Sequence, residues 1–231
     1  MVRPYGELSL ETYRQLSNDL VKYAVDEPRA VIVVVDDLLI DEQPLLTAFT
    51  RAWNRISEWP AIPLLLVAAT PAAYTRFTAS ALRSFVPLHQ SVAEAADAAT
   101  GASARRRVRT RVGVTGGARV ARRFVEGICG RWAVSQVCGD ASLIVTELVE
   151  NAFLHTDVDC VGLRLELWSD VLTVAVSDTD PREAVLRETA GDTKRFGLHI
   201  VSRLSMAWGC SPQWPTGKVV WATLPTRQRR R

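Results

Sequence analysis

Residues 140–155 constrain the fold most, because their apolar positions recur with the period of an α-helix. The apolar residues of this stretch are Leu143, Ile144, Leu148, Val149 and Ala152. Glu147, Asn151 and His155 are four residues apart, so on a helix they lie along one polar stripe. A carboxylate can orient a hydroxyl or a water, and an amide oxygen suits a hard cation such as magnesium. The alternative interpretation is a solvated polar face on a helix that packs against a core.

The first hundred residues alternate short apolar runs with segments of helical period. Buried strands are predicted over 30–35, 63–69 and 84–87, and helices over 10–23, 41–59, 71–82 and 91–98. Strands that alternate with helices at this spacing indicate a small α/β domain with helices packed on a sheet. We therefore expect one domain over residues 1–99.

The second half has a different order of elements. Helices are predicted over 118–132 and 140–155, followed by strands over 162–168 and 171–177 joined by a two-residue hairpin turn. A long loop over 178–194, a helix over 196–206 and a closing strand over 218–224 complete the pattern. In the helix over 118–132 the predicted apolar stripe is Val120, Phe124, Ile128 and Trp132. Helices grouped before a mostly antiparallel sheet indicate an α+β layer over 114–225.

Charge is distributed unevenly along the chain. Residues 1–100 carry 8 basic and 12 acidic groups, whereas residues 101–231 carry 20 basic and 13 acidic groups. Nine of these basic groups are arginines in two clusters, over 105–111 and 227–231. We predict an Arg-rich linker over 100–113 and a basic tail over 226–231, both solvated rather than part of a folded face. Such runs can also attract nucleic acid or acidic partners, although no aromatic residues are interleaved with the arginines.

Composition narrows the class of protein. The apolar runs, such as 30–35 and 61–69, are far too short to cross a membrane, and no secretory segment opens the chain. Cys129, Cys138, Cys160 and Cys210 have neither metal-ligand nor short disulfide spacing. We expect a cytoplasmic protein with reduced cysteines and no membrane partner.

A second group of candidate site residues follows the two strands. Asp178 ends the strand over 171–177 and opens the long loop, a position where ligand-binding groups often project. The loop closes at a helix start that contains Gly197, where backbone N–H groups can approach a phosphate. Lys194 and Arg195 are the cations nearest to that helix start.

The order of these motifs resembles the GHKL (Bergerat-fold) ATPases, and within them the anti-sigma-factor serine kinases. Residues 146–155 are similar to the first motif of that family, 174–181 to the second and 196–204 to the third. Trp208-Gly209 and residues 217–221 are similar to the usual ending of the fold. The resemblance spans about residues 114–225. It implies an α/β sandwich with a mostly antiparallel sheet that binds ATP with Mg²⁺.

The resemblance also implies a role for each motif residue. Asn151 would ligate magnesium, Glu147 would be the general base toward a serine hydroxyl, and Asp178 would accept a hydrogen bond from the adenine amino group. The nucleotide-covering lid would comprise Lys194, Arg195, Phe196, Gly197 and Leu198. The chain departs from the family at Arg195, where glycine is usual, and after Asp178, where no glycine follows. Glu147 favours kinase activity, whereas the missing glycines favour a nucleotide-gated binding module without turnover.

The first domain resembles the STAS domain of anti-sigma-factor antagonists over about residues 4–98. In that family a serine at the turn after the second strand is the phosphorylation site. Here Glu42 and Gln43 stand where the serines would fall, and neither can accept a phosphoryl group. The resemblance implies a degenerate antagonist-like domain, in which Glu42 would supply a fixed negative charge or would simply be an acidic residue at a helix start.

Together, these features predict an ATP-binding regulator that controls a sigma factor or its antagonist by partner switching, with possible serine/threonine kinase activity. The alternative is a catalytically inactive, nucleotide-gated protein-binding module. A nucleic-acid-associated regulator that uses the arginine clusters is a third hypothesis. Homodimerisation is common in the family that the second domain resembles, and a homodimer is therefore an expectation from that resemblance alone.

Overall fold

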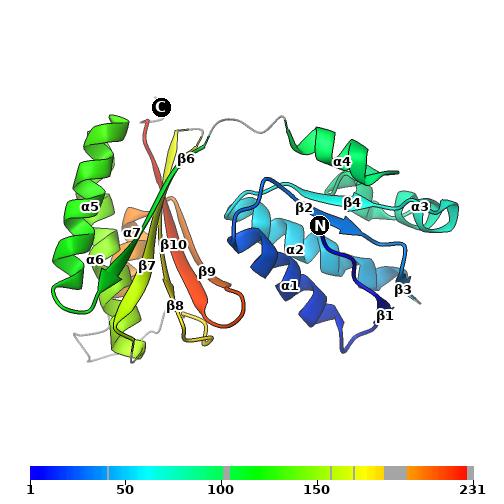
Figure 1. Cartoon of the computed structure of the whole chain (residues 1–231), viewed down its shortest axis with the longest axis horizontal. Helices are drawn as coiled ribbons and strands as arrows, with labels where there is room; N and C mark the ends of the chain where they lie inside the picture. The colour runs from blue at the N-terminus through cyan, green and yellow to red at the C-terminus, as the bar shows by residue number, and fades with distance from the viewer. Residues whose placement is uncertain (41, 101–104, 157, 169, 185–196, 228–231) are drawn as a thin grey trace. The chain divides into compact units, whose positions relative to one another are not determined.

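The computed structural model of the 231-residue chain describes residues 1–40, 42–100, 105–156, 158–168, 170–184 and 197–227. The fold is mixed α/β and divides into two compact units, Met1–Ala102 and Ser103–Arg231 (Figure 1). None of the helices in the described ranges is both long enough and apolar enough to cross a membrane.

The N-terminal unit contains a parallel three-stranded sheet in the order β2 (Val31–Val34), β4 (Leu64–Val67) and β5 (Leu88–His89). Helix α4 (Val92–Ala99) packs on the face formed by Val34, Leu65 and Val67, while the alternate residues of β2 and β4 are also buried. Helices α1 (Tyr13–Val25) and α2 (Thr47–Glu58) pack against each other, and α3 (Pro71–Thr78) follows β4. A strand buried on both faces explains the continuous apolar runs of this half.

Several of the predicted boundaries in this unit are wrong, and the helix predicted over 71–82 ends at Thr78. The strand predicted over 84–87 is not formed there: Ser84 ends a 3₁₀ helix, Ala81–Ser84, and the paired residues are Leu88–His89. The backbone N–H groups of Leu66 in β4 and of Ala68 just after it donate to the carbonyls of Pro87 and His89, so pairing with β4 sets the position of this strand. The helix predicted over 41–59 is a 3₁₀ turn, Gln43–Leu46, followed by α2.

A two-stranded pair, β1 (Gly6–Leu8) with β3 (Leu38–Ile40), lies outside the main sheet of the N-terminal unit, and its strands are parallel. β3 was missed because it has only three residues and is separated from the longer apolar run of β2 by Asp36 and Asp37 alone.

The C-terminal unit is a five-stranded antiparallel sheet in the order β6-β7-β8-β10-β9. Its strands are β6 (Arg106–Gly113), β7 (Cys160–Trp168), β8 (Val171–Asp178), β9 (Ala207–Pro212) and β10 (Lys218–Pro225). Helices α5 (Gly117–Trp132), α6 (Cys138–His155) and α7 (Gly197–Leu204) lie on one face, and their apolar side chains form one core with that face (Figure 1). Trp168 pairs with Val171, which confirms the two-residue connection between β7 and β8.

The predicted Arg-rich linker over 100–113 is wrong from Arg106 onward, because these residues form the edge strand β6, paired with β7. Its even-numbered residues Val108 and Val112 pack on the core, so the arginines at odd positions lie on the opposite face. The Glu166 carboxylate accepts hydrogen bonds from Arg105 at 2.9 Å and from Arg107 at 2.9 Å. Pairing with β7 makes this arginine-rich segment a strand, which its composition alone did not indicate.

The two central helices agree with the sequence in extent but not in every buried position. α6 contains the whole predicted stretch 140–155, yet Leu143 is 52% exposed. On α5 the buried residues include Ala121, Val125 and Cys129 rather than Val120, which is 47% exposed. The predicted stripe residues Ile128 and Trp132 are buried as expected, and the buried face also includes the small side chains of Ala121 and Cys129.

Candidate functional site

A pocket of about 650 Å³ opens in the C-terminal unit between α6, the segment after β8, the first turn of α7 and the start of β10. The lining residues are Glu147, Glu150, Asn151, Leu154, His155, Asp180, Arg182, Glu183, Ala184, Gly197, Leu198, His199 and Lys218. Segments separated by some seventy positions in the sequence therefore meet at one cavity, whose size suits a small organic ligand.

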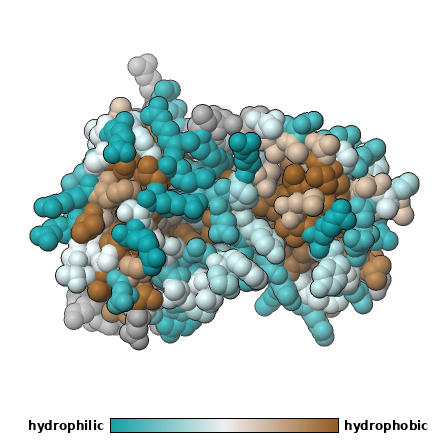
Figure 2. All heavy atoms as spheres, in the orientation of Figure 1, coloured by the Kyte–Doolittle hydropathy of each residue, from teal (hydrophilic) through white to brown (hydrophobic). Residues whose placement is uncertain are grey.

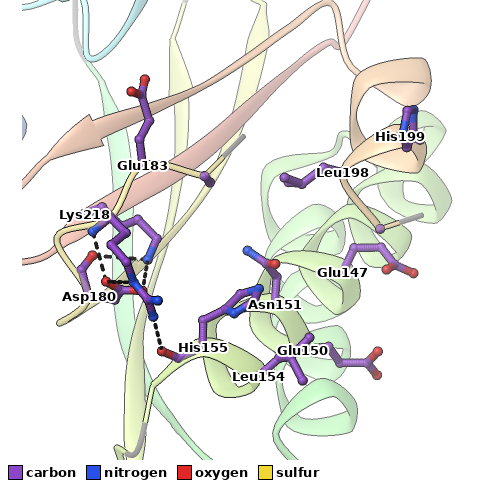
Figure 3. A pocket seen from close by; sticks show the side chains of 13 residues that line it. Glu147, Glu150, Asn151, Leu154, His155, Asp180, Glu183, Leu198, His199 and Lys218 are labelled. Atoms are coloured by element: carbon purple, nitrogen blue, oxygen red, sulfur yellow. Dashed lines mark hydrogen bonds and ion pairs between the residues drawn. The ribbon is translucent and has the colours of Figure 1, made fainter. Parts of the chain in front are cut away.

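Helix α6 contributes the predicted polar stripe to this pocket. Glu147, Asn151 and His155 all line it, as their four-residue spacing requires. Ile144, Leu148 and Ala152 on the same helix are buried in the core, which fixes the rotation of the stripe toward the cavity. In Figure 3 the carboxylates of Glu147 and Glu150 point away from the side of the pocket formed by Asp180 and Lys218.

The Glu147 carboxylate lies against the first residue of α7. A Cβ atom placed on Gly197 would be 2.6 Å from Oε2 of Glu147, so a larger residue there would displace the carboxylate from this position. Burial raises the pKa of Glu147, and the neighbouring Glu150 charge raises it further. A carboxylate whose affinity for a proton is increased is suited to accept one from a hydroxyl group.

Asp178, at the end of β8, lies beneath the pocket instead of lining it. Its Oδ1 accepts a hydrogen bond from Nζ of Lys218 at 2.9 Å and from the backbone N–H of Asp180 at 2.9 Å. The side chains of Asp178 and Lys218 are 1% and 4% exposed. The two residues are direct partners in the β8–β10 register, which brings the charges together at the end of the ladder.

Lys218 was not predicted from the sequence. It is the one charged residue in 218–224, a strand that is otherwise apolar apart from Thr223 and is buried throughout. A charged residue at the end of a buried strand requires an opposite charge, and that pattern was the available signal. Gly217 precedes it with φ of 112°, and a Cβ there would lie 2.2 Å from the Asp178 carbonyl oxygen.

Asp180 and Arg182 extend this charged network to the pocket surface. The guanidinium of Arg182 lies 2.9 Å from Oδ2 of Asp180, and Nζ of Lys218 donates to the Asp180 carbonyl at 3.1 Å. Hydrogen bonds from Arg182, first from its side chain and then from its backbone, hold the pKa of Asp180 well below its usual range. The segment after β8 is thus held by ion pairs where glycine residues are usual in the resembled family.

The other predicted site residues are placed as follows. Gly197 and Leu198 line the pocket at the start of α7. Lys194, Arg195 and Phe196 lie outside the described residues.

The charge of the described lining is negative. Glu147, Glu150, Asp180 and Glu183 outnumber the two permanent cations Arg182 and Lys218. Within the described ranges, no cluster of three or more His, Cys, Asp or Glu side chains could hold a metal ion. The Asn151 side chain, which also lines the pocket, has an amide oxygen, a type of ligand that Mg²⁺ accepts.

Neither the models of known protein families nor the curated proteins yield a match to this chain.

Proposed function

We propose that the C-terminal unit binds ATP together with Mg²⁺ and is a regulator of the anti-sigma-factor serine kinase type. The observation that carries the proposal is the convergence of three motifs on one pocket: the α6 stripe, the segment after β8 and the start of α7. These are the motifs on which the resemblance to GHKL ATPases rests. Pockets of 300–1,000 Å³ typically hold ligands of nucleotide size, and about 650 Å³ falls within that range.

The electrostatics of the pocket favour a nucleotide that arrives with a divalent cation. Four carboxylates on the described lining would repel a bare triphosphate, whereas a magnesium–nucleotide complex carries less negative charge. Asn151 would offer its amide oxygen to that ion. The first N–H groups of α7, beginning at Gly197, would offer donors to phosphate oxygens.

In the kinase form of the proposal, the chain transfers the terminal phosphoryl group of ATP to a serine hydroxyl of a partner. Glu147 would accept the hydroxyl proton as the oxygen attacks phosphorus, and ADP would leave. Magnesium would neutralise charge on the phosphates while the protein positions the reactants. The raised pKa of Glu147 supports its role as the base.

A nucleotide-gated binding module is the second candidate. Two observations favour it: Glu147 is directed toward Gly197, and ion pairs to Lys218 and Arg182 hold the segment after β8. In that form ATP would change the affinity for a protein partner without phosphoryl transfer. Both forms share the same nucleotide site, so a binding measurement tests both.

For the N-terminal unit itself we propose an antagonist-like origin. Its parallel sheet with helices is compatible with the STAS-like domain inferred from the sequence. We propose that the protein works in the cytoplasm on a sigma factor or an anti-sigma-factor antagonist, and that it forms a homodimer. Glu42 at the start of the 3₁₀ turn before α2 would replace a phosphorylatable serine.

The deciding experiment is calorimetry of ATP binding to the full chain, with and without magnesium. Wild type should bind in the presence of magnesium, and Asn151→Ala should weaken binding by roughly tenfold or more. Asn54→Ala, an exposed asparagine on α2, is the matched control and should bind like wild type. The absence of binding by wild type would remove both candidate functions.

If ATP binds, transfer from labelled ATP to a serine-bearing antagonist protein separates the two candidates. Transfer that disappears in Glu147→Ala, with ATP binding retained, would establish the kinase. Binding of ATP that changes the affinity for the antagonist, without any labelled product, would establish the gated module. Transfer that persists undiminished in Glu147→Ala would exclude Glu147 as the base.

A further inference from the structure

Two cysteines lie next to each other where the chain turns from α5 into α6. Cys129 is in the last turn of α5, and Cys138 is the first residue of α6. Cys129 belongs to the core of the C-terminal unit, and Cys138 packs against that core. The lining of the proposed nucleotide site begins further along α6, at Glu147, so neither thiol belongs to that site.

The backbone between the two cysteines is held in a tight reversal. Ala133 ends α5 in the left-handed conformation, with φ of 58°. The N–H of Val134 then donates to the Cys129 carbonyl at 3.0 Å. A 3₁₀ turn, Ser135–Val137, leads directly into α6. Because these local bonds turn the chain back on itself, they place Cys138 against Cys129 without any movement of the two helices.

The two thiols also interact with each other, which the other cysteines do not do. A side-chain hydrogen bond joins Cys129 and Cys138. Sγ of Cys160 accepts a hydrogen bond from Arg111, and Sγ of Cys210 accepts one from a backbone N–H group. All four cysteines are free. A cysteine can serve in a core as a small apolar residue, but that role requires no second thiol beside it.

The two members of the pair differ in exposure. Cys129 is fully buried, whereas Cys138 is partly exposed. Burial and the adjacent Cys138 thiol raise the pKa of Cys129 to about 12. Oxidants react with a thiolate rather than with a thiol, and they must reach the sulfur from solvent. Cys138 is therefore the sulfur that reacts first, and Cys129 is its resolving partner.

We propose that Cys129 and Cys138 form a reversible disulfide when the protein meets hydrogen peroxide. The Cys138 sulfur attacks one oxygen of the peroxide, the O–O bond breaks, and a sulfenic acid and one water form. The Cys129 sulfur then attacks the sulfenic sulfur, the S–O bond breaks, the S–S bond forms, and a second water leaves. The two sulfurs are oxidised, the peroxide is reduced, and each water receives one thiol proton. A dithiol reductant reverses the reaction by exchange.

The test treats the full chain with hydrogen peroxide, alkylates the remaining thiols and locates the products by mass spectrometry. We expect one intramolecular disulfide, between the peptides that contain Cys129 and Cys138, and its removal by dithiothreitol. Dimedone, which traps sulfenic acids, should label Cys138. Cys129→Ala should accumulate that label and form no disulfide. The matched control, Cys160→Ala with Cys210→Ala, keeps the pair and should form the same disulfide as wild type.

The cross-link should also be measurable as a change in stability. It restricts the unfolded chain, so oxidation should raise the melting temperature of the C-terminal unit by roughly 5 °C or more. The control variant should show the same rise, and Cys129→Ala with Cys138→Ala should show none. Circular dichroism checks that each variant folds, and the disulfide mapped in wild type depends on no variant.

Four results would overturn the inference. Sulfinic or sulfonic acid on Cys138 without a disulfide would mean that Cys129 cannot resolve the first product. A disulfide to Cys160, to Cys210 or to a second chain would mean that the pair is not the preferred one. No reaction at Cys138, under conditions that oxidise N-acetylcysteine, would mean that peroxide does not reach it. A lower melting temperature after oxidation would mean that the bond distorts the folded chain. None of these outcomes depends on ATP binding.

Discussion

Nζ of Lys218 lies 2.9 Å from Oδ1 of Asp178, and both side chains are almost completely buried. Replacing Lys218 with methionine would leave the Asp178 carboxylate buried without its cation. We expect the C-terminal unit to lose about 3–5 kcal/mol of unfolding free energy. Urea unfolding followed by hydrogen exchange of β8 and β10 would measure this unit separately. Lys218→Met combined with Asp178→Asn should lose less than the two single losses added; simple additivity would show that the pair is not coupled.

Gly217 precedes that lysine in a backbone conformation that L-residues rarely adopt. Its φ is 112°, and a Cβ would lie 2.2 Å from the Asp178 carbonyl oxygen. Gly217→Ala should therefore destabilise the C-terminal unit by about 1–3 kcal/mol. Gly127→Ala, in α5 with open space around the added carbon, should instead stabilise it by about 1 kcal/mol. Thermal unfolding of both variants checks the sign, and a neutral Gly217→Ala would contradict the close approach.

The Asp180 carboxylate should make the stability of the C-terminal unit depend on pH in acidic solution. Because hydrogen bonds from Arg182 lower its pKa in the folded state, its contribution is present above the ordinary aspartate pKa of about 4. That contribution is lost as the pH falls below this value. Asp180→Asn should thus be less stable than wild type at neutral pH, and the difference should shrink in acid. Arg182→Ala should reproduce the effect; a difference that stays constant with pH would refute it.

The effect of Glu147 on the pH dependence of stability should be opposite to that of Asp180. Burial and the charge of Glu150 raise its pKa, so the ionised side chain costs stability as the pH rises through that raised value. In the absence of ligand, Glu147→Gln should melt at a higher temperature than wild type at neutral pH. The advantage should vanish in acid, where wild-type Glu147 is protonated. A Gln variant that is less stable at neutral pH would show that the carboxylate is stabilised by a contact instead.

Glu166 of β7 forms ion pairs with two arginines at the start of β6. Its side chain is 6% exposed and is bonded by Arg105 and Arg107. Glu166→Gln should lower unfolding free energy by about 1–3 kcal/mol, with little dependence on salt because the pairs are largely buried. Asp170→Asn removes the exposed pair with Arg227, at 3.4 Å, and should change stability by less than about 1 kcal/mol. Urea unfolding at low and high salt compares the two.

The elements that sequence could predict are those with a strong period. The helix over 140–155 and the turn between β7 and β8 are confirmed, because their patterns are local. β6 was missed because it is half arginine, and only its pairing with β7 makes it a strand. β9 was missed as well, since its six residues include glycine, cysteine and proline and depend on the register with β10.

In the candidate site, too, the residues that share one local pattern could be predicted, whereas those brought together by strand pairing could not. The spacing of Glu147, Asn151 and His155 was enough to bring them to one pocket, since they share a helix. Asp178 was identified as a strand-end carboxylate, but its partner Lys218 is forty positions away, and no local pattern pairs them. The register between β8 and β10, which local sequence does not show, therefore places Asp178 beneath the cavity and next to Lys218.

The paired positions of Asp178 and Lys218 also have a consequence for how the sheet assembles. β10 is apolar on both faces, so sliding it by one residue along β8 would still bury hydrophobic side chains. An alternating polar pattern normally excludes such slips, and β10 lacks one. A shift by one residue would turn Lys218 to the other face and leave Asp178 unpaired in the interior. The ion pair beneath the pocket therefore selects one alignment of the two central strands during folding.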